Sequence, residues 1–537
     1  MPQLIWSLAF FIAAPSFLLV IYIKLNDRRL QALPSRIASL SERLTPESVR
    51  KRSNEFFSTA PAKEIKSKLP ERTGRRYIVV GGGGFLGGWV VQQLLERGEH
   101  PENIRVLDLS PSPANRAVSE AIPSGLEYLK TDISDAQAVD DAFNRPWSRH
   151  SESTTVFHVA ASIRFYEHHP MFLQRSVKVN VEGVRNVLEA AKRVGVDVFV
   201  YTSSGSVALK STRMLLWPWE SEPKDFVQVI NDDTPLPKEH WDYFSNYSVS
   251  KAAGEKLVRA TDGEVLGNGK RMRTGCIRPG NGVFGPRGDI LLEAYLFRKA
   301  NPTWIWNIMQ SFCYVENCAL AHLLYERCLI DLINQEGQRL PDIGGQAFCV
   351  ADPGPPPTFG DANTLLETLT EGECHFIHLS PTLLFIISKL IEIYYINQHR
   401  FVSLPFVPTF LKSLVPAIKG DIINLQPPLF YLTNAHLIFD DSRARLSPEK
   451  GGLGYEGVWT TEEGLYRTWK EYDQGNKQPH RGAAPGIGFV GGGGRKNGKT
   501  TVDAALQAPA TAAHVVKEGL EVPVTPVEND DWELTTE

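Results

Sequence analysis

The sequence predicts an α/β protein built on a doubly wound parallel sheet, and three observations indicate this fold class. Apolar runs typical of strands lie near Ile78, Val106, Leu126, Val156 and Val198. Helical patterns alternate with these runs and are centred near Val90, Ala138 and Val187. A glycine-rich segment joins the first predicted strand to the first predicted helix. Strands and helices that alternate in this way are typical of a parallel sheet with helices packed on both faces.

The glycine-rich segment has the spacing of a phosphate-binding turn. Its glycines form the pattern G-x-x-G-x-x-G, and a helical run follows them. Glycines permit a tight turn and a close approach of the backbone to a pyrophosphate. The N-terminus of the next helix then presents unpaired N–H groups to the phosphates. We therefore expect a dinucleotide to bind at Gly81, Gly84, Phe85, Leu86 and Gly87.

An acidic residue lies where a dinucleotide site places its ribose ligand. Asp108 ends the second predicted strand, about 20 residues beyond the last motif glycine. A carboxylate hydrogen-bonds the ribose hydroxyls and repels a 2′-phosphate, so the predicted cofactor is NAD. Arg105 and Arg116 lie nearby in the sequence and keep NADP open as the less favoured alternative.

A second motif indicates what chemistry the dinucleotide serves. Tyr247 and Lys251, in a helical run that continues to Ala260, lie one helical turn apart on one face. Tyrosine, with a pKa near ~10, is a poor base at neutral pH. A neighbouring ammonium and a positively charged nicotinamide both favour the phenolate. Because an upstream apolar strand also ends in the hydroxyls of Ser203 and Ser204, we expect nicotinamide-dependent oxidation or reduction here.

These residues resemble the extended short-chain dehydrogenase/reductase superfamily. More narrowly they resemble its 3β-hydroxysteroid dehydrogenase/isomerase family, which includes the sterol 4α-carboxylate 3-dehydrogenases. The resemblance extends from about Arg75 to about Tyr472. The superfamily motifs are Gly81–Gly87, Val156–Ala161, Lys178–Gly183, Tyr201–Ser204 and Tyr247–Lys251. The narrower motifs are Ile277–Pro286, Pro427–Leu429 and Leu453–Tyr455.

The sequence departs from the family pattern in two places. Val80 precedes the first motif glycine where the family usually has threonine, which removes a loop-ordering hydroxyl but no phosphate-binding N–H. The interval between Ser204 and Tyr247 is longer than usual and contains Trp217-Pro218-Trp219. This insertion leaves the shape of the substrate pocket open.

The resemblance implies a role for each residue of the catalytic motif. Tyr247 would be the general base, Lys251 would hold the nicotinamide ribose and lower the phenol pKa, and Ser204 would hydrogen-bond the reacting oxygen. Ser203 is the alternative if the register differs by one. Asn180 is expected to be structural or to position a water rather than to catalyse.

The resemblance also implies further cofactor contacts, at Ala160, Pro279 and Asp132. Asp132 would lie near the adenine, and the equally weighted alternative is an N-cap for the helix that begins at Ala136. No metal site is predicted, because the thirteen histidines show no metal-ligand spacing.

The N-terminal segment predicts a membrane anchor. Leu4 to Ile23 is apolar and uncharged, close to the ~20 residues that a bilayer-spanning helix needs. A cleaved signal peptide is the rival, but the basic start and small-residue cleavage site that it needs are missing. Basic residues follow directly, and six cysteines without paired spacing suit a reducing compartment. We expect a single-pass protein of the endoplasmic reticulum membrane, with its catalytic domain facing the cytosol.

Composition divides the rest of the chain. The predicted segments are a transmembrane anchor at 1–24, a polar stalk at 25–74, a Rossmann-like NAD-binding core at 75–290, a smaller C-terminal substrate-binding part at 291–474, and a disordered tail at 475–537. Within the substrate-binding part, 376–416 is apolar but carries Lys389 and Glu392. Because two charges disfavour a full span, we expect a helix that lies in the membrane interface, or alternatively an ordinary buried helix.

The tail contains a pattern that we do not interpret as a site. Gly493 to Thr500 matches the phosphate-loop pattern G-x-x-x-x-G-K-T, but no convincing strand precedes it. The near-neutral net charge of −4 gives no reason to expect a nucleic-acid partner.

Taken together, these features predict NAD-dependent oxidation of the 3β-hydroxyl of a steroid or sterol, with decarboxylation at C4 or Δ5 isomerisation as the step that could follow. The predicted partners are this substrate, membrane lipid and, by the resemblance, a second copy of the chain. One alternative is a carbonyl reductase of secondary metabolism. A non-catalytic dinucleotide-sensing scaffold is another, although such proteins usually lose the tyrosine or the lysine.

Overall fold

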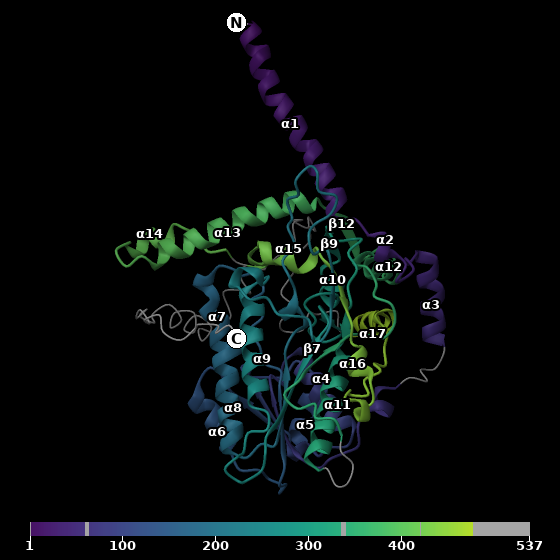
Figure 1. Cartoon of the computed structure of the whole chain (residues 1–537), viewed down its shortest axis with the longest axis vertical. Helices are drawn as coiled ribbons and strands as arrows, with labels where there is room; N and C mark the ends of the chain where they lie inside the picture. Colours follow the sequence, from purple (N-terminus) through teal and green to yellow (C-terminus); the bar gives the residue numbers. More distant parts are fainter. Residues whose placement is uncertain (1, 59–63, 335–339, 419, 476–537) are drawn as a thin grey trace, which may run out of the picture. The chain divides into compact units, whose positions relative to one another are not determined.

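A seven-stranded parallel sheet forms the centre of the protein (Figure 1). The computed structural model describes residues 2–58, 64–334, 340–418 and 420–475, with side chains for all of these except 2–13 and 421. The strands follow the order β11-β7-β5-β4-β1-β2-β3 and are all parallel. Their bounds are β1 Arg76–Val80, β2 Ile104–Asp108, β3 Glu127–Lys130, β4 Thr154–His158, β5 Val198–Thr202, β7 Arg273–Pro279 and β11 Ala347–Val350. The predicted doubly wound α/β fold is confirmed.

Helices cover both faces of this sheet, as the apolar side chains of its strands require. Figure 1 shows α6, α8 and α9 on one side and α4, α5 and α11 on the other. Each face has its own buried hydrophobic cluster. The bounds of these helices are α4 Phe85–Glu96, α5 Arg116–Ala121, α6 Ala136–Asn144, α8 Val184–Arg193, α9 Asn246–Ala260 and α11 Val315–Ile333.

The predicted boundary at residue 290 does not coincide with the end of the sheet. Strand β11 pairs with β7 at the sheet edge, and α11 packs on β5, β7 and α4. Both elements come from the second half of the chain, so the nucleotide-binding core extends beyond the predicted 75–290. The reason is that β7 would otherwise be the edge strand. Its buried side chains need a neighbouring strand and a covering helix, and residues 315–350 supply both.

Smaller sheets and further helices surround this sheet, and most of them come from the second half of the chain. The two-stranded sheets pair β6 (Val227–Ile230) with β13 (His436–Phe439), β8 (Val283–Phe284) with β10 (Cys313–Tyr314), and β9 (Ala300–Thr303) with β12 (His375–His378). The remaining helices are α7 Leu173–Val177, α10 Glu293–Arg298, α12 Phe359–Leu369, α13 Pro381–Ser403, α14 Thr409–Ser413, α15 Pro427–Thr433, α16 Ser442–Arg445 and α17 Thr461–Gln474. The predicted tail 475–537, with its phosphate-loop pattern, lies outside the described residues apart from Gly475.

The N-terminal segment differs from the predicted anchor and stalk. Helix α1 is one continuous helix, Pro2–Leu30. Within the described part of the chain, no helix has both the length and the hydropathy needed to cross a membrane, so the transmembrane helix predicted at 1–24 finds no support. The C-terminal turns of α1 contain the charged residues Lys24, Asp27 and Arg28.

Residues 25–74 are also not an isolated stalk. They form the end of α1, α2 (Ser35–Ala38) and α3 (Pro46–Ser58), and they pack against the body of the protein. Leu30 and Val49 are fully buried in a hydrophobic cluster shared with α12 and α17. Composition alone missed this packing because only a few apolar side chains of a polar segment need to face the core.

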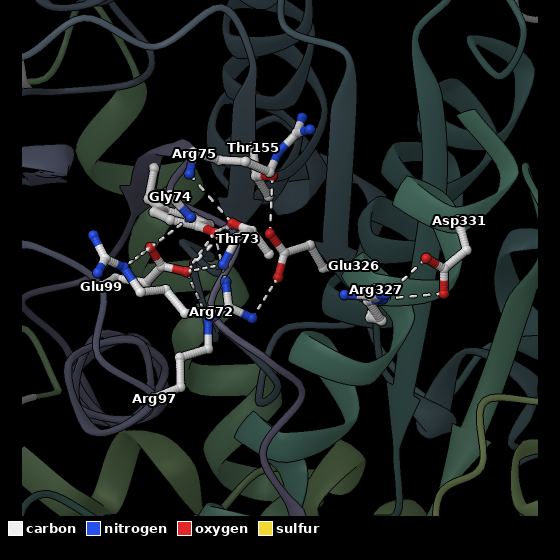
Figure 2. Close-up of polar contacts among 11 residues, drawn as sticks. Arg72, Thr73, Gly74, Arg75, Arg97, Glu99, Thr155, Glu326, Arg327 and Asp331 are labelled. Carbon is white, nitrogen blue, oxygen red and sulfur yellow. Dashed lines mark hydrogen bonds and ion pairs between the residues drawn. The ribbon is translucent and has the colours of Figure 1, made fainter. Parts of the chain in front are cut away.

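A buried ion-pair network joins the segment before β1 to the sheet and to α11 (Figure 2). The Arg97 guanidinium donates to Glu326 at 2.8 Å, to Glu99 at 3.2 Å and to the hydroxyl of Tyr77 at 2.6 Å. Thr155 donates to the same Glu326 carboxylate at 3.0 Å. The side chains of Arg97, Glu99 and Glu326 are almost completely buried. One arginine therefore compensates two buried carboxylates that lie on different elements.

Candidate active site

The glycine loop lies between β1 and α4, at the carboxyl edge of the sheet. Gly81 has a φ of +84°, and a Cβ there would lie 2.6 Å from the backbone nitrogen of Ala160. A Cβ on Gly87 would overlap the carbonyl oxygen of Gly81. Packing within the protein therefore requires glycine at both positions. This places Ala160, two residues beyond β4, against the loop, and its predicted contact with the cofactor stays a prediction.

The middle glycine is required for a different reason. A Cβ on Gly84 would meet no protein atom closer than 3.4 Å, so the fold itself has room for a side chain there. Gly84 is the N-cap residue of α4, whose first N–H groups face outward from the helix end. A pyrophosphate needs this free approach to backbone N–H groups. The loop therefore fits a dinucleotide.

A cavity of about 130 Å³ continues from this loop to the end of β2. It is lined by Gly83, Gly84, Phe85, Asp108, Ser110, Ser112, Pro113, Ala114, Arg287 and Gly288. The Asp108 carboxylate accepts from the backbone nitrogens of Gly83 at 3.0 Å and Ser110 at 2.8 Å. Asp108 thus holds the glycine loop and lines the space where a ribose would bind.

Arg287 is the arginine of this cavity, and the sequence reasoning missed it. It follows Pro286 of the family motif, and its guanidinium donates to Glu471 at 2.6 Å and to Gln92 at 2.9 Å. Arg105, in contrast, is fully buried and donates to Glu127 and to carbonyls of the α6 end. Arg116 is exposed and pairs with Glu120. The arginine close in space to Asp108 therefore comes from a distant part of the chain.

Asp132 and Pro279 lie at the ends of neighbouring strands. Asp132 is exposed after β3 and accepts from the backbone and hydroxyl of Ser134 at 2.9 and 2.8 Å. The N-cap of α6 is Asp135, so the alternative role of Asp132 as that cap is wrong. Pro279 ends β7, and its carbonyl lies behind Gly205, next to Ser204.

The structure brings Tyr247 and Ser204 together. Ser245 caps α9 in a capping box with Ser248, which places Tyr247 in the first turn of this helix. The half-buried Tyr247 has its pKa raised to about 12 by burial, and a hydrogen bond with the Ser204 hydroxyl opposes this shift. The Ser204 hydroxyl also lies 2.7 Å from that of Ser206. Ser203 points the other way, so the register that selects Ser204 is the one in the structure.

Lys251 lies one turn along the same helix and is almost fully buried. Its ammonium donates to the carbonyl of Thr202 and lies 4.2 Å from the ring centroid of Tyr201. Burial lowers the pKa of Lys251 to about 7. A buried amine with so few donor contacts gains from further acceptors, and the two hydroxyls of a ribose are acceptors of this kind.

Two polar networks hold α9 in place behind the site. The Glu255 carboxylate accepts from Ser203 at 2.6 Å and from Arg278 at 2.9 and 2.6 Å, which ties α9 to β5 and β7. Burial raises the pKa of Glu255, but these hydrogen bonds keep it below its usual value. Asn180 uses its amide on the backbone of Ser162 and the hydroxyl of Ser250. Both residues position the helix that carries Tyr247 and Lys251.

A second cavity, of about 370 Å³, lies next to the catalytic helix. Its lining residues are His168, Ser211, Thr212, Arg213, Met214, Leu215, Trp241, Phe385 and Tyr431. Tyr431 also packs on the hydrophobic cluster that contacts Tyr247. The lining is largely apolar and aromatic, and the volume falls in the range of about 300–1,000 Å³ common for ligand sites.

Together these groups can bind a dinucleotide and exchange a proton with an alcohol or a carbonyl. Ser204 can hold the reacting oxygen, because its hydroxyl lies beside that of Tyr247. Tyr247 can accept the alcohol proton once its phenol is ionised, and Lys251 can contact the ribose side of the cofactor. Bound NAD would supply the hydride acceptor.

Comparison with known proteins identifies a family and several similar proteins. The chain matches the model of the 3-beta hydroxysteroid dehydrogenase/isomerase family over residues 78–375. It is 29% identical over 443 residues to 3beta-hydroxysteroid-dehydrogenase/decarboxylase isoform 2 of Arabidopsis thaliana, covering 80% of this chain and 68% of that protein. It is 30% identical over 290 residues to a decarboxylating sterol-4-alpha-carboxylate 3-dehydrogenase of Candida albicans, covering 52% of this chain and 70% of that protein. Among solved structures, Pal from Bacillus thuringiensis aligns with a TM-score of 0.48 at 17% identity, covering 74% of this chain and 99% of that chain.

Proposed function

Because the chain belongs to the 3-beta hydroxysteroid dehydrogenase/isomerase family and is therefore an oxidoreductase, we propose that it oxidises the 3β-hydroxyl of a steroid or sterol with NAD. The observation that carries this proposal is the Tyr247–Ser204 pair, one helical turn from the buried Lys251 and at the carboxyl edge of a dinucleotide-binding sheet. The same geometry argues against a non-catalytic scaffold, because every group that the reaction needs is in place.

In the proposed reaction the substrate hydroxyl lies between Ser204 and Tyr247. Ser204 donates to or accepts from the reacting oxygen and fixes its position. Tyr247 takes the hydroxyl proton as the C3–H bond breaks, and the hydride leaves for the dinucleotide. The Lys251 ammonium stabilises the phenolate by its charge. The largely apolar cavity beside Tyr431 would hold the rigid hydrocarbon body of the substrate.

Within this class we favour a substrate with a carboxylate at C4. Both relatives described above carry names that include a decarboxylase or decarboxylating activity. Oxidation at C3 of such a substrate produces a β-keto acid, which loses CO₂ through an enolate without a further catalytic group. A Δ5-3β-hydroxysteroid is the second candidate, although its isomerisation requires a second proton transfer. Tyr247 is the group that could perform that transfer.

Product analysis tests the substrate class. The purified protein is incubated with NAD and either a 4-carboxysterol or a Δ5-3β-hydroxysteroid, and products are identified by mass spectrometry. We expect NADH and a 3-oxo product that has lost CO₂ from the first substrate. If neither substrate reacts and unrelated ketones are reduced rapidly, the protein is instead a carbonyl reductase.

The cofactor preference is a separate prediction. Asp108 should make NAD the preferred dinucleotide, and Asp108→Ser should lower the NAD-to-NADP ratio of kcat/KM by about tenfold, which corresponds to about 1.4 kcal/mol. The reason is that the mutation removes the repulsion of a 2′-phosphate while Arg287 remains in the same cavity. Asp108→Asn is the matched control for loop geometry, because it removes the charge and keeps an acceptor for Gly83 and Ser110. A wild-type protein that already prefers NADP would show that Asp108 has been assigned wrongly.

The location of the protein is part of the same proposal. We propose that it works on the cytosolic side of the endoplasmic reticulum, where a lipid-soluble substrate and a reducing compartment meet. The six cysteines, all free and buried, support the reducing compartment. Protease added to the cytosolic side of sealed microsomes should digest the bulk of the chain, and protection of that bulk would place it in the lumen.

A further inference from the structure

Helix α13 presents an uncharged apolar stripe to solvent. The exposed residues Leu383, Ile386, Ile387, Leu390, Ile393 and Tyr394 recur at the spacing of one helical face. Leu390 is 62% exposed. The following segment continues this character, with Phe406 at 77% exposure and Phe410 and Leu414 also exposed on and around α14. A continuous exposed apolar surface of this kind marks an interaction site.

The charged residues Lys389 and Glu392 of α13 are not part of this stripe. Lys389 pairs with Glu392 at 3.0 Å, and its ammonium lies 5.7 Å from the ring of Phe385 and 5.9 Å from that of Tyr431. Phe385 and Tyr431 both line the 370 Å³ cavity. One helix therefore has an apolar outer face and an inner face that forms the wall of the cavity next to the catalytic helix.

The buried residue Asn26, near the end of α1, is hydrogen-bonded both to α13 and to the segment around Leu215. The Asn26 amide donates to Thr382, in the first turn of α13, at 2.8 Å and to the carbonyl of Met214 at 2.9 Å. Its oxygen accepts from the backbone nitrogen of Leu216 at 3.1 Å. Met214 and Leu216 flank Leu215, which lines the cavity and is itself exposed. The end of α1, the start of α13 and the insertion around Trp217 therefore meet at one place.

The same place carries exposed aromatic and basic side chains. Trp217 and Trp219 stack at a centroid distance of 5.3 Å, and Trp219 is 76% exposed. Arg29 holds this loop by donating to the carbonyls of Trp217 and Pro218. Lys24 and Arg28 are exposed on the last turns of α1, and no acidic partner is found for either within the described residues. The exposed apolar residues 17–21 precede them on α1.

We propose that this surface, formed by the outer face of α13, α14 and the Trp217–Trp219 loop, docks on a lipid bilayer, and that the cavity behind α13 receives its substrate from that bilayer. Tryptophan and arginine or lysine beside an apolar helix face suit the interface between acyl chains and anionic headgroups. Two acidic residues near the tryptophan loop are neutralised, since Glu220 pairs with Arg213 and Glu222 with Arg36. The docking surface stands without the proposed function, whereas the entry route rests on it.

A site-specific fluorophore tests the docking surface in the full chain. Because all six native cysteines are buried, a single exposed cysteine can be labelled selectively. Leu390→Cys and Trp219→Cys place an environment-sensitive label on the surface. Val265→Cys is the matched control, since Val265 is a 59% exposed apolar residue on the Val265–Arg271 turn that follows α9. Vesicles of phosphatidylcholine with phosphatidylserine should shift the emission at 390 and 219 to shorter wavelength and leave that at 265 unchanged.

The dependence of the emission shift on lipid composition and salt tests the contribution of the basic residues. The shift should weaken without phosphatidylserine and at high salt, because Lys24 and Arg28 act through screened charge. In the unlabelled full chain, Ile386→Glu with Leu390→Glu should reduce the vesicle-bound fraction by about tenfold or more. No spectral change at position 390 in vesicle-bound protein would overturn the proposal. A change at 390 that instead depends on protein concentration and needs no vesicles would assign this face to a second copy of the chain. None of these readouts requires turnover, so failure here is distinct from failure of the proposed function.

Discussion

Tyr247→Phe is expected to reduce turnover of the 3β-hydroxyl substrate by about 100-fold or more, the usual scale for a positioned acid or base. The substitution removes the proton acceptor and keeps the ring that packs on the hydrophobic cluster around Leu437 and Phe439. NAD binding should persist, because the glycine loop, Asp108 and Lys251 are untouched. Steady-state kinetics and a separate titration of NAD binding measure both quantities.

The pH dependence supplies an independent readout. Burial holds the pKa of the Tyr247 phenol at about 12, and the proposed reaction needs the phenolate. Below pH 7, where Lys251 keeps its charge, the rate of oxidation should therefore increase with pH, because the ionised fraction of Tyr247 increases. This increase should disappear in the residual activity of Tyr247→Phe. Tyr243→Phe, which alters a neighbouring phenol outside the site, is the matched control and should retain both rate and pH profile. Near-normal turnover by Tyr247→Phe would exclude the proposed mechanism.

Arg97→Leu is expected to lower the free energy of unfolding by about 3–5 kcal/mol, the typical cost of breaking a buried ion pair by removing one partner. Glu326 and Glu99, both buried, would lose the guanidinium that they share, and Glu99 would keep the more distant Arg72 at 3.9 Å (Figure 2). The network joins β1, the end of α4 and α11, and it lies away from the catalytic residues. Chemical denaturation followed by circular dichroism measures the change.

Two further variants separate charge from packing. Glu326→Gln in the Arg97→Leu background should recover part of the lost stability, because it removes the buried charge that has lost its arginine. Arg116→Leu, which breaks an exposed pair with Glu120, should change stability little. If Arg97→Leu changes the free energy of unfolding no more than Arg116→Leu does, the network does not stabilise the fold.

Local motifs could be interpreted from the sequence because their geometry lies within a single turn or helix. The spacing of Gly81, Gly84 and Gly87 is a property of one strand–turn–helix connection. Tyr247 and Lys251 lie on the same face of any helix that contains both, and α9 spans the predicted range Asn246–Ala260. The alternation of apolar and helical runs likewise predicted a parallel sheet with helices on both faces. In each case the determining contacts lie close together in the sequence.

Other features depended on residues that meet only in the folded chain. Arg287 lines the same cavity as Asp108 although the two residues are far apart in the sequence. Strand β11 likewise joins the sheet that contains β1, although β1 lies much earlier in the chain. Residues 25–74, which are polar in composition, pack on the body because Leu30 and Val49 find a hydrophobic cluster built from α12 and α17. The pattern of one segment contains no information about partners of this kind.

The sequence by itself indicated the fold class, the proposed dinucleotide loop and the proposed catalytic tyrosine and lysine, because backbone geometry over a few residues dictates the spacing of each. Only the tertiary structure decided between Ser203 and Ser204. The two serine side chains follow the end of β5 and point in opposite directions. The position of α9 places Tyr247 beside the hydroxyl of Ser204, whereas Ser203 contacts Glu255. The tertiary structure also showed that Lys389 and Glu392 pair with each other and that Phe385 of α13 lines the cavity, which composition could not reveal. Which side of a helix or strand faces the core follows from the packing of the whole chain.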